Sequence, residues 1–295
     1  MTPLPSIAFA GVGLMGLRMS QRLLAAGYPL TVWNRSPDKC VPLVEAGARQ
    51  VGSPAELCAA ADIVLLCLAD TVVVRDVVFG SNGIVEGAQP GQLLVDHSSL
   101  EPAATRIMAA ELESRSGMRW VDAPVSGGTA GAEAGSLAIM AGGRLEDVER
   151  VRPVLMSLGQ RLTRMGDVGA GQVTKACNQM IVACNALVIA EVVALAERSG
   201  VDTSLIAPAL AGGFADSRPL QILAPQMAAS DFEPVKWHVR TLLKDLDTAV
   251  QLSREEGSAT PMTGLAAQLM RLHGSLGHLE NDPATLVELF REGKA

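Results

Sequence analysis

Short apolar runs alternate with longer amphipathic stretches over the first half of the chain. The apolar runs predict buried strands at Ser6–Ala10, Leu30–Trp33, Gln50–Val51, Ile63–Leu68, Leu93–Asp96, Arg119–Asp122 and Ser136–Ala141. The stretches between and after them predict helices at Leu14–Ala26, Asp38–Ala46, from Ser53 onward, Thr71–Phe79, Pro102–Arg115 and Leu145–Leu158. Strands that alternate with helices in this way are typical of a doubly wound, mostly parallel α/β sheet with right-handed crossovers.

The pattern changes after about Gly171, where no further strand is predicted. A stretch without proline or glycine, 172–199, predicts one helix about 40 Å long. Further helices are predicted at Thr203–Leu210, Arg218–Met227, Val239–Glu256, Met262–Gly274 and Pro283–Arg291. We therefore expect a sheet domain at residues 1–165 and an all-α domain at residues 166–295, joined by the long helix.

Composition narrows the class of protein. The 295 residues are 48% hydrophobic and 19% charged, which is typical of a globular chain rather than a disordered one. The net charge of −7, without any basic run, argues against a nucleic-acid partner. The most apolar stretch, Met180–Leu195, contains Asn185 and Glu191, so no membrane span is expected.

Cysteines and the N-terminal residues bear on the compartment. The five cysteines are scattered without a CxxC pair, which predicts buried, reduced thiols and no metal site. The first residues lack a basic region and a cleavage site, so no signal peptide is expected. These features together predict a cytoplasmic protein.

A glycine-rich loop follows the first predicted strand directly and opens the first predicted helix. Its sequence is Gly11-Val12-Gly13-Leu14-Met15-Gly16. In this position such a loop is the fingerprint of a Rossmann domain, because its glycines allow a tight turn, a close approach of the pyrophosphate and close helix–strand packing. The helix N-terminus then offers N–H groups to the phosphates. We expect all six residues to contact a nicotinamide dinucleotide.

The end of the second strand bears on the choice between NAD and NADP. A carboxylate that would accept hydrogen bonds from the ribose 2′-OH is absent there, and the chain has Asn34, Arg35 and Ser36. Arg35 could stack on adenine or pair with a 2′-phosphate. The sequence predicts an NADP preference, with NAD as the alternative.

Four motifs in this order resemble the β-hydroxyacid dehydrogenase family, which includes 3-hydroxyisobutyrate dehydrogenase and tartronate semialdehyde reductase. They are FAGVGLMG at 9–16, DAPVSGGTAGAEAGSL at 122–137, GAGQVTKACNQM at 169–180 and KDLDTA at 244–249. The resemblance covers essentially the whole chain. It implies an NAD(P)-dependent enzyme that interconverts a short semialdehyde acid and its β-hydroxyacid by hydride transfer, and it implies a homodimer or homotetramer.

The resemblance also assigns roles to residues. Lys175 matches the catalytic lysine, which transfers the proton to or from the substrate oxygen. A lysine in an apolar helix is costly to bury, and desolvation would lower its pKa toward working pH. Substrate-binding residues are matched by Ser126, Gly127, Gly128 and Asn178. Cofactor contacts are matched by Leu68, Ala69, Ser99 and Lys244, although Ala69 stands where relatives often have proline.

Several functions remain open at this point. The GG-x-A-x-S pattern of Gly212, Gly213, Ala215 and Ser217 is similar to tartronate semialdehyde reductases, which favours reduction of tartronate semialdehyde to glycerate. Hydroxyisobutyrate, L-serine and succinic semialdehyde are alternatives within the family. A non-catalytic cofactor-binding module and an imine reductase are alternatives of other classes, and the presence of Lys175 argues against both.

Overall fold

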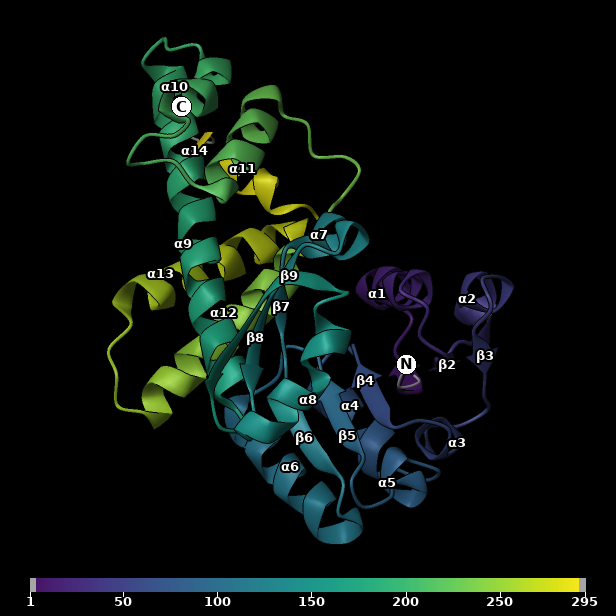
Figure 1. The fold of residues 1–295 in the computed structure, drawn as a ribbon. Helices are drawn as coiled ribbons and strands as arrows, with labels where there is room; N and C mark the ends of the chain where they lie inside the picture. The colour runs from purple at the N-terminus through teal and green to yellow at the C-terminus, as the bar shows by residue number, and fades with distance from the viewer. Residues whose placement is uncertain (1–3, 292–295) are drawn as a thin grey trace. The chain divides into compact units, whose positions relative to one another are not determined.

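The computed structural model describes residues 4–291. The chain divides into two compact units, Met1–Lys175 and Ala176–Ala295, and Figure 1 shows the elements of each. The first unit contains all the strands found in residues 4–291, and the second contains helices. The predicted α/β domain followed by an all-α domain is therefore confirmed.

A nine-stranded sheet forms the centre of the N-terminal unit. Its strand order is β3-β2-β1-β4-β5-β6-β8-β7, with β9 paired to β8. The order of the first six strands is the one typical of dinucleotide-binding sheets, and all their pairings are parallel. The strands are β1 Ile7–Ala10, β2 Leu30–Trp33, β3 Arg49–Gln50, β4 Ile63–Leu66, β5 Leu93–Asp96, β6 Arg119–Asp122, β7 Val125–Ser126, β8 Leu137–Gly142 and β9 Gly159–Gly166.

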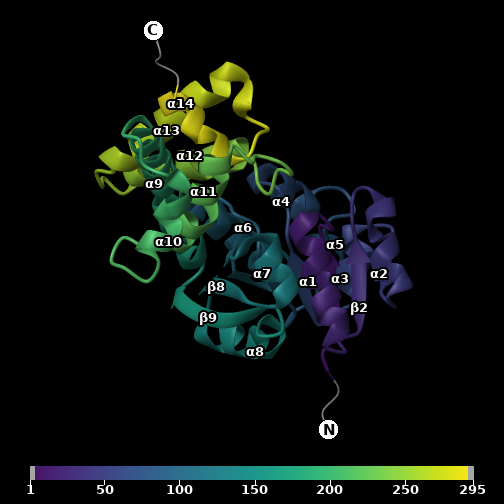
Figure 2. The ribbon, with the colours of Figure 1, turned by 90° about the horizontal axis from the view of Figure 1, so that it is seen from above.

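Both faces of this sheet are buried. Successive side chains of a strand point to opposite faces, and β1 shows it: Ile7 and Phe9 pack into one apolar cluster, whereas Ala8 and Ala10 pack into another. Helices cover each face, as expected for a doubly wound sheet. Figure 2 shows α1 beside α7, two helices far apart in the sequence that contact each other.

The helices of this unit begin and end largely where capping residues predict. The side chain of Ser53 caps α3 and that of Asp70 caps α4. The predicted helix Asp38–Ala46 is instead a 3-10 turn, Pro37–Cys40, followed by α2. The α-helices are α1 Leu14–Ala25, α2 Val41–Glu45, α3 Pro54–Ala59, α4 Thr71–Phe79, α5 Ile84–Gly87, α6 Pro102–Ser116, α7 Gly128–Ala134 and α8 Leu145–Leu155.

The last part of the sheet departs from the prediction. The short elements α5, α7 and β7 were not predicted, and neither was β9. The sequence of β9, GQRLTRMG, is mostly polar with exposed side chains at an edge of the sheet, so it lacks the apolar signal of a buried strand. Strand β8 pairs antiparallel with β6 and β7, which explains why the sheet is mostly rather than wholly parallel.

The long helix α9 spans Ala170–Arg198, two residues earlier at its start than predicted. Among the described residues, it is the helix with the length and composition to cross a membrane, with a window of mean hydropathy 2.0. Core helices of soluble proteins share these properties. Ala183, Ala186, Ala190 and Val193 lie in the apolar core of the C-terminal unit.

The C-terminal unit is built from helices around that core. Apart from α9, the α-helices are α10 Ile206–Leu210, α11 Arg218–Ala229, α12 Val239–Glu255, α13 Pro261–His273 and α14 Glu288–Arg291. Short 3-10 turns occur at Thr203–Leu205 and Pro283–Val287, and a π-helical turn, Gly274–His278, follows α13. Leu, Ala, Val, Ile and Met side chains fill the buried centre of the core, as the scarcity of aromatic residues predicts.

Candidate active site

The glycine loop forms a tight turn between β1 and α1. Gly11 has a φ of +99°, and a Cβ there would lie 2.3 Å from the carbonyl oxygen of Cys67. A Cβ at Gly16 would lie 1.9 Å from the carbonyl oxygen of Gly11. Both glycines are therefore required by the packing of the turn itself.

Gly13 is different, because a Cβ there would meet no atom of the described residues within 4 Å. Gly13 is the N-cap of α1, and in the described part of the chain no side chain bonds the helix N-terminus. The first turn also contains no acidic residue. The backbone N–H groups and the positive end of the helix dipole are thus suited to a phosphate, and the loop fits the pyrophosphate of a dinucleotide.

The end of β2 supports this loop. Asn34 accepts a hydrogen bond on Oδ1 from the Val12 N–H at 2.9 Å, and its Nδ2 donates to the Ser36 carbonyl oxygen at 2.9 Å. Asn34 therefore braces the glycine loop from the position where NAD enzymes often carry a ribose-binding carboxylate. Arg35 and Ser36 are exposed.

The ends of β4 and β5 are joined by a hydrogen bond. The Leu68 N–H donates to the Ser98 hydroxyl at 2.9 Å, and Ser98 is buried. Ala69 is exposed and Ser99 is half-buried. The sequence singled out Ser99 as a cofactor contact, whereas Ser98 is the neighbour that holds the Leu68 segment.

Two buried aspartates end the adjacent strands β5 and β6. Asp96 and Asp122 are register partners, and both are fully buried. Burial raises the pKa of Asp96 to about 7, and the nearby Asp122 adds to the rise. Burial likewise raises the pKa of Asp122 to about 6, against several hydrogen bonds that lower it.

Asp122 caps the start of α9. Its Oδ1 accepts from the Gly169 N–H at 2.7 Å and its Oδ2 from the Gln172 N–H at 2.9 Å. A carboxylate at this place is stabilised by the N-terminal end of the helix dipole. The end of β6 and the first turn of α9 are thereby held together.

His97 directly follows Asp96 at the end of β5 and is buried. Its Nδ1 is 2.7 Å from the Ala123 carbonyl oxygen. Burial lowers the pKa of His97 to about 4, so the ring is neutral at physiological pH.

The predicted substrate segment straddles β7 and α7. Ser126 ends β7, Gly127 is the N-cap of α7, and Gly128 is its first residue. Gly127 and Gly128 have φ values of +138° and +63°, backbone conformations that favour glycine. This turn presents small residues at a helix start, which is compatible with a carboxylate ligand.

Lys175 lies on α9, close to that segment. It is half-buried, and its Nζ donates to the Val125 carbonyl oxygen at 3.0 Å. The hydrogen bond brings the ammonium to the residue directly before Ser126. Three of the residues assigned by resemblance, Lys175, Ser126 and Gly127, therefore belong to one neighbourhood of the N-terminal unit.

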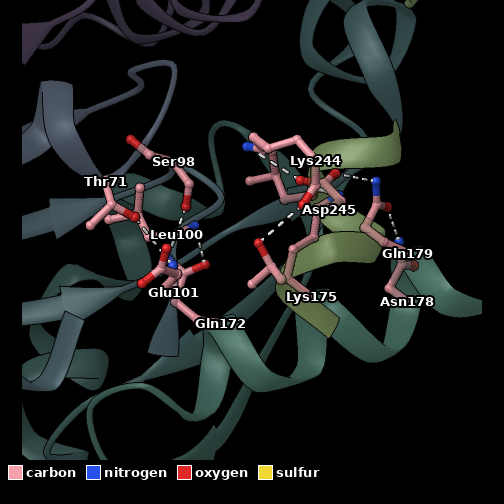
Figure 3. Close-up of polar contacts among 12 residues, drawn as sticks. Thr71, Ser98, Leu100, Glu101, Gln172, Lys175, Asn178, Gln179, Lys244 and Asp245 are labelled. Carbon is pink, nitrogen blue, oxygen red and sulfur yellow. Dashed lines mark hydrogen bonds and ion pairs between the residues drawn. The ribbon is translucent and has the colours of Figure 1, made fainter. Parts of the chain in front are cut away.

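The C-terminal unit contains a series of hydrogen bonds between polar side chains. Asn178 donates through Nδ2 to Gln179 Oε1 at 2.7 Å, and Gln179 donates through Nε2 to Asp245 Oδ2 at 2.6 Å. The carboxylate of Asp245 also pairs with Lys244, at 3.3 Å from Nζ. Figure 3 shows these contacts, which orient the amide of Asn178 and hold the ammonium of Lys244 beside Asp245.

Four residues that support the site were not assigned from the sequence: Ser98, Asp122, Gln172 and Gln179. All four are buried; Asp122, Gln172 and Gln179 lie within the quoted motifs, and Ser98 directly precedes Ser99. Buried polar groups need partners, so a polar residue at the end of a predicted buried strand or within the apolar long helix was the available signal. The partners themselves come from distant segments and required the fold.

The cysteines and the potential metal ligands were the other candidates for chemistry. All five cysteines are free, and Cys177 is exposed, so the expectation that every thiol is buried was wrong. Burial raises the pKa of Cys58 to about 12. Among residues 4–291, no group of three His, Cys, Asp or Glu side chains could hold a metal ion.

Two family models match the chain in succession. One, described as the NAD binding domain of 6-phosphogluconate dehydrogenase, matches residues 6–166. The other, described as NAD-binding of NADP-dependent 3-hydroxyisobutyrate dehydrogenase, matches residues 169–290.

Individual proteins match over nearly the full length. The chain is 34% identical to 2-hydroxy-3-oxopropionate reductase of Escherichia coli, over 96% of each chain. It is 33% identical to NAD-dependent L-serine dehydrogenase of Pseudomonas aeruginosa, over 96% of this chain and 97% of the other. A structure of 3-hydroxyisobutyrate dehydrogenase from Mycobacterium tuberculosis with L-serine matches with a TM-score of 0.88 and 30% identity, over 98% of this chain and 100% of that one.

Proposed function

The chain belongs to the β-hydroxyacid dehydrogenase family and is an NAD(P)-dependent oxidoreductase, and from that premise we propose that it reduces a short semialdehyde acid with NADPH. The observation that carries the proposal is the bond from Lys175 Nζ to the Val125 carbonyl oxygen. It holds an ammonium beside the Ser126–Gly128 turn, where a proton donor and an anion-binding backbone would act on one small substrate.

The proposed preference for NADPH rests on the end of β2. Asn34 is engaged with the backbone at Val12 and Ser36, and no carboxylate stands there to repel a 2′-phosphate. The exposed guanidinium of Arg35 and the hydroxyl of Ser36 are then the groups that would bind that phosphate. Gly11–Gly16 would hold the pyrophosphate, and Leu68, Ala69, Ser99 and Lys244 would contact the rest of the cofactor.

The proposed mechanism uses few groups. The nicotinamide supplies or accepts the hydride when it is bound. Lys175 donates a proton to the aldehyde oxygen in reduction and accepts it back in oxidation. The N–H groups and hydroxyl of Ser126–Gly128 bind the substrate carboxylate, and Asn178 hydrogen-bonds the substrate from one turn further along α9.

Tartronate semialdehyde, reduced to glycerate, is the substrate that we propose. The supporting feature is the segment 210–217, in which the Gly212 N–H donates to Asp216 Oδ2 at 2.7 Å and Phe214 is fully exposed. Its sequence is similar to tartronate semialdehyde reductases. 3-Hydroxyisobutyrate, L-serine and succinic semialdehyde are the alternatives, and relatives named for the first two are among the matches.

We also propose that the protein is a cytoplasmic homodimer or homotetramer. Ile181, Val188 and Leu195 follow each other at seven-residue intervals on α9, and all three are exposed in the single chain. Such a stripe on a helix favours packing against another helix.

The proposal is tested with Lys175→Met, which removes the ammonium and keeps the length of the side chain. Hydride transfer would be followed in a single turnover by loss of NADPH absorbance. The expected loss in rate is about 100- to 10,000-fold, with NADPH binding unchanged. Lys236→Met, an exposed lysine of the C-terminal unit, is the matched control. A Lys175→Met rate within a factor of about two of the wild type would contradict the mechanism.

A further inference from the structure

A buried hydrogen-bonded network connects the Leu68 segment to the helix that carries Lys175. We infer that Gln172 and Ser98 are positioning residues that couple cofactor binding to the placement of Lys175. The inference rests on the proposed function, because it takes Lys175 as the proton donor. Figure 3 shows Gln172, Ser98 and Leu100 together.

Gln172 uses both ends of its amide within the network. Its Nε2 donates to the Ser98 carbonyl oxygen at 2.8 Å, and its Oε1 accepts from the Leu100 N–H at 3.0 Å. The two bonds hold the backbone on both sides of Ser99, the residue assigned to the cofactor. Gln172 is only 1% exposed, so water does not compete for these partners.

Ser98 carries the connection on to the cofactor segment. Its hydroxyl accepts from the Leu68 N–H at 2.9 Å, and its own N–H donates to Asp96 Oδ1 at 2.9 Å. The ends of β4 and β5 are thus held at a fixed spacing. A displacement of Ser98 would move the Leu68 segment, and with it the surface that the cofactor contacts.

The other end of the network is the first turn of α9. The Gln172 N–H donates to Asp122 Oδ2, and Lys175 follows three residues later on the same helix face. A helix transmits a shift of its first turn as a rigid element. The same residue, Gln172, therefore sets the distance from the β5 end to the helix turn that presents the lysine.

The role of Gln172 goes beyond filling the core, because a hydrophobic side chain of equal size would fill the same volume. What it would not do is pair the Ser98 carbonyl and the Leu100 N–H. These two backbone groups would be left without their partner, and the segment would adopt other positions. The effect should therefore appear in cofactor binding and in rate, and not in stability alone.

The test compares wild type, Gln172→Met, Ser98→Ala and the double variant. Dissociation constants for NADPH would be measured by fluorescence titration, and single-turnover rates at saturating NADPH with the most active semialdehyde. We expect Gln172→Met to weaken NADPH binding about tenfold and to slow the rate about 10- to 100-fold, since a small misplacement of a reacting group is enough for this. Thr174→Val, on the same turn but outside the network, is the matched control.

The decisive measurement is whether the effects of the two substitutions on NADPH binding are coupled. If both residues act through the Ser98 segment, the double variant should bind NADPH no more than about twofold worse than the weaker-binding single variant. Effects that multiply independently would overturn the inference. So would a Gln172→Met protein with a lower melting temperature but with NADPH binding and rate within about twofold of wild type.

Two further arms keep the result interpretable. If Gln172→Met fails to fold, Gln172→Glu keeps the shape and the acceptor for Leu100 but removes the donor to Ser98, and the same weakening of NADPH binding is expected. Lys175→Met separates the two proposals. A fast Lys175→Met enzyme contradicts the proposed function, whereas a slow one alongside an unaffected Gln172→Met enzyme contradicts only the present inference.

Discussion

Two helix N-termini in the N-terminal unit are treated in opposite ways. At α1 the N-cap is Gly13, and no side chain in the described residues bonds the free N–H groups. At α9 the buried carboxylate of Asp122 accepts bonds from Gly169 and Gln172. One terminus is suited to a ligand anion, and the other is filled by an anion of the chain itself.

The same physical property of a helix N-terminus thus serves ligand binding in one helix and anchoring in the other. A helix N-terminus favours a negative charge whatever its source. At α1 the small residues keep the approach open for a phosphate. At α9 the carboxylate of Asp122 holds the first turn of the helix, and the next turn carries Lys175, the proton donor proposed above.

Removal of the internal anion should have the largest effect. Asp122→Ala leaves the N–H groups of Gly169 and Gln172 unpaired in a buried place, and we expect a loss of about 2–5 kcal/mol in the free energy of unfolding. Urea denaturation at pH 7 measures it. Asp167→Ala, an exposed carboxylate paired with Arg164, is the control and should cost less than about 1 kcal/mol. Equal losses in the two variants would contradict the anchoring role.

Gly13→Ala and Gly16→Ala should separate binding from folding at α1. A Cβ at Gly13 meets no described atom within 4 Å, so stability should be unchanged, while NADPH binding weakens tenfold or more, at about 1.4 kcal/mol per tenfold. A Cβ at Gly16 would clash with the Gly11 carbonyl oxygen, so Gly16→Ala should lower the melting temperature. Thermal denaturation and NADPH titration of both variants measure this. Unchanged NADPH affinity in Gly13→Ala would show that the phosphate does not bind at the N-terminus of α1.

Arg35→Ala should change the choice of cofactor. A charge-assisted bond to the 2′-phosphate is lost, so kcat/KM with NADPH should fall about tenfold, whereas kcat/KM with NADH should stay within about twofold. Arg161→Ala, an exposed arginine of β9, is the control. An equal fall in kcat/KM with NADPH and with NADH would show that Arg35 contacts a part that the two cofactors have in common.

The buried acid at the end of β5 should affect stability through pH. The pKa of Asp96 is raised to about 7 in the folded protein, so its contribution to stability is fully present below pH 3.8 and is lost as the pH rises through about 7. Asp96→Asn has no such loss. As the pH rises from 4 to 7, the free energy of unfolding of Asp96→Asn should therefore increase relative to that of the wild type, by at most about 1.4 kcal/mol per pH unit. Denaturation curves across this range test it, and a constant difference would contradict it.

The order of strands and helices was predictable because the hydrophobic periodicity and the capping residues that specify each element are local features of the sequence. Ser53 opens a helix as predicted, and the glycine loop forms a tight turn between the first strand and the first helix. Strand β9 was missed because its edge position does not require an apolar sequence. The bonds of Gln172 to Ser98 and of Asp122 to Gly169 join segments 47 to 74 residues apart, and no local pattern specifies such pairs.

The proposed activity is tested directly by one panel of initial rates. Tartronate, succinic and methylmalonic semialdehydes and 2-aminomalonate semialdehyde would each be offered with NADPH and with NADH, and the absorbance of the reduced cofactor followed. We predict the highest kcat/KM for tartronate semialdehyde with NADPH. Absence of turnover with every semialdehyde under both cofactors would contradict it.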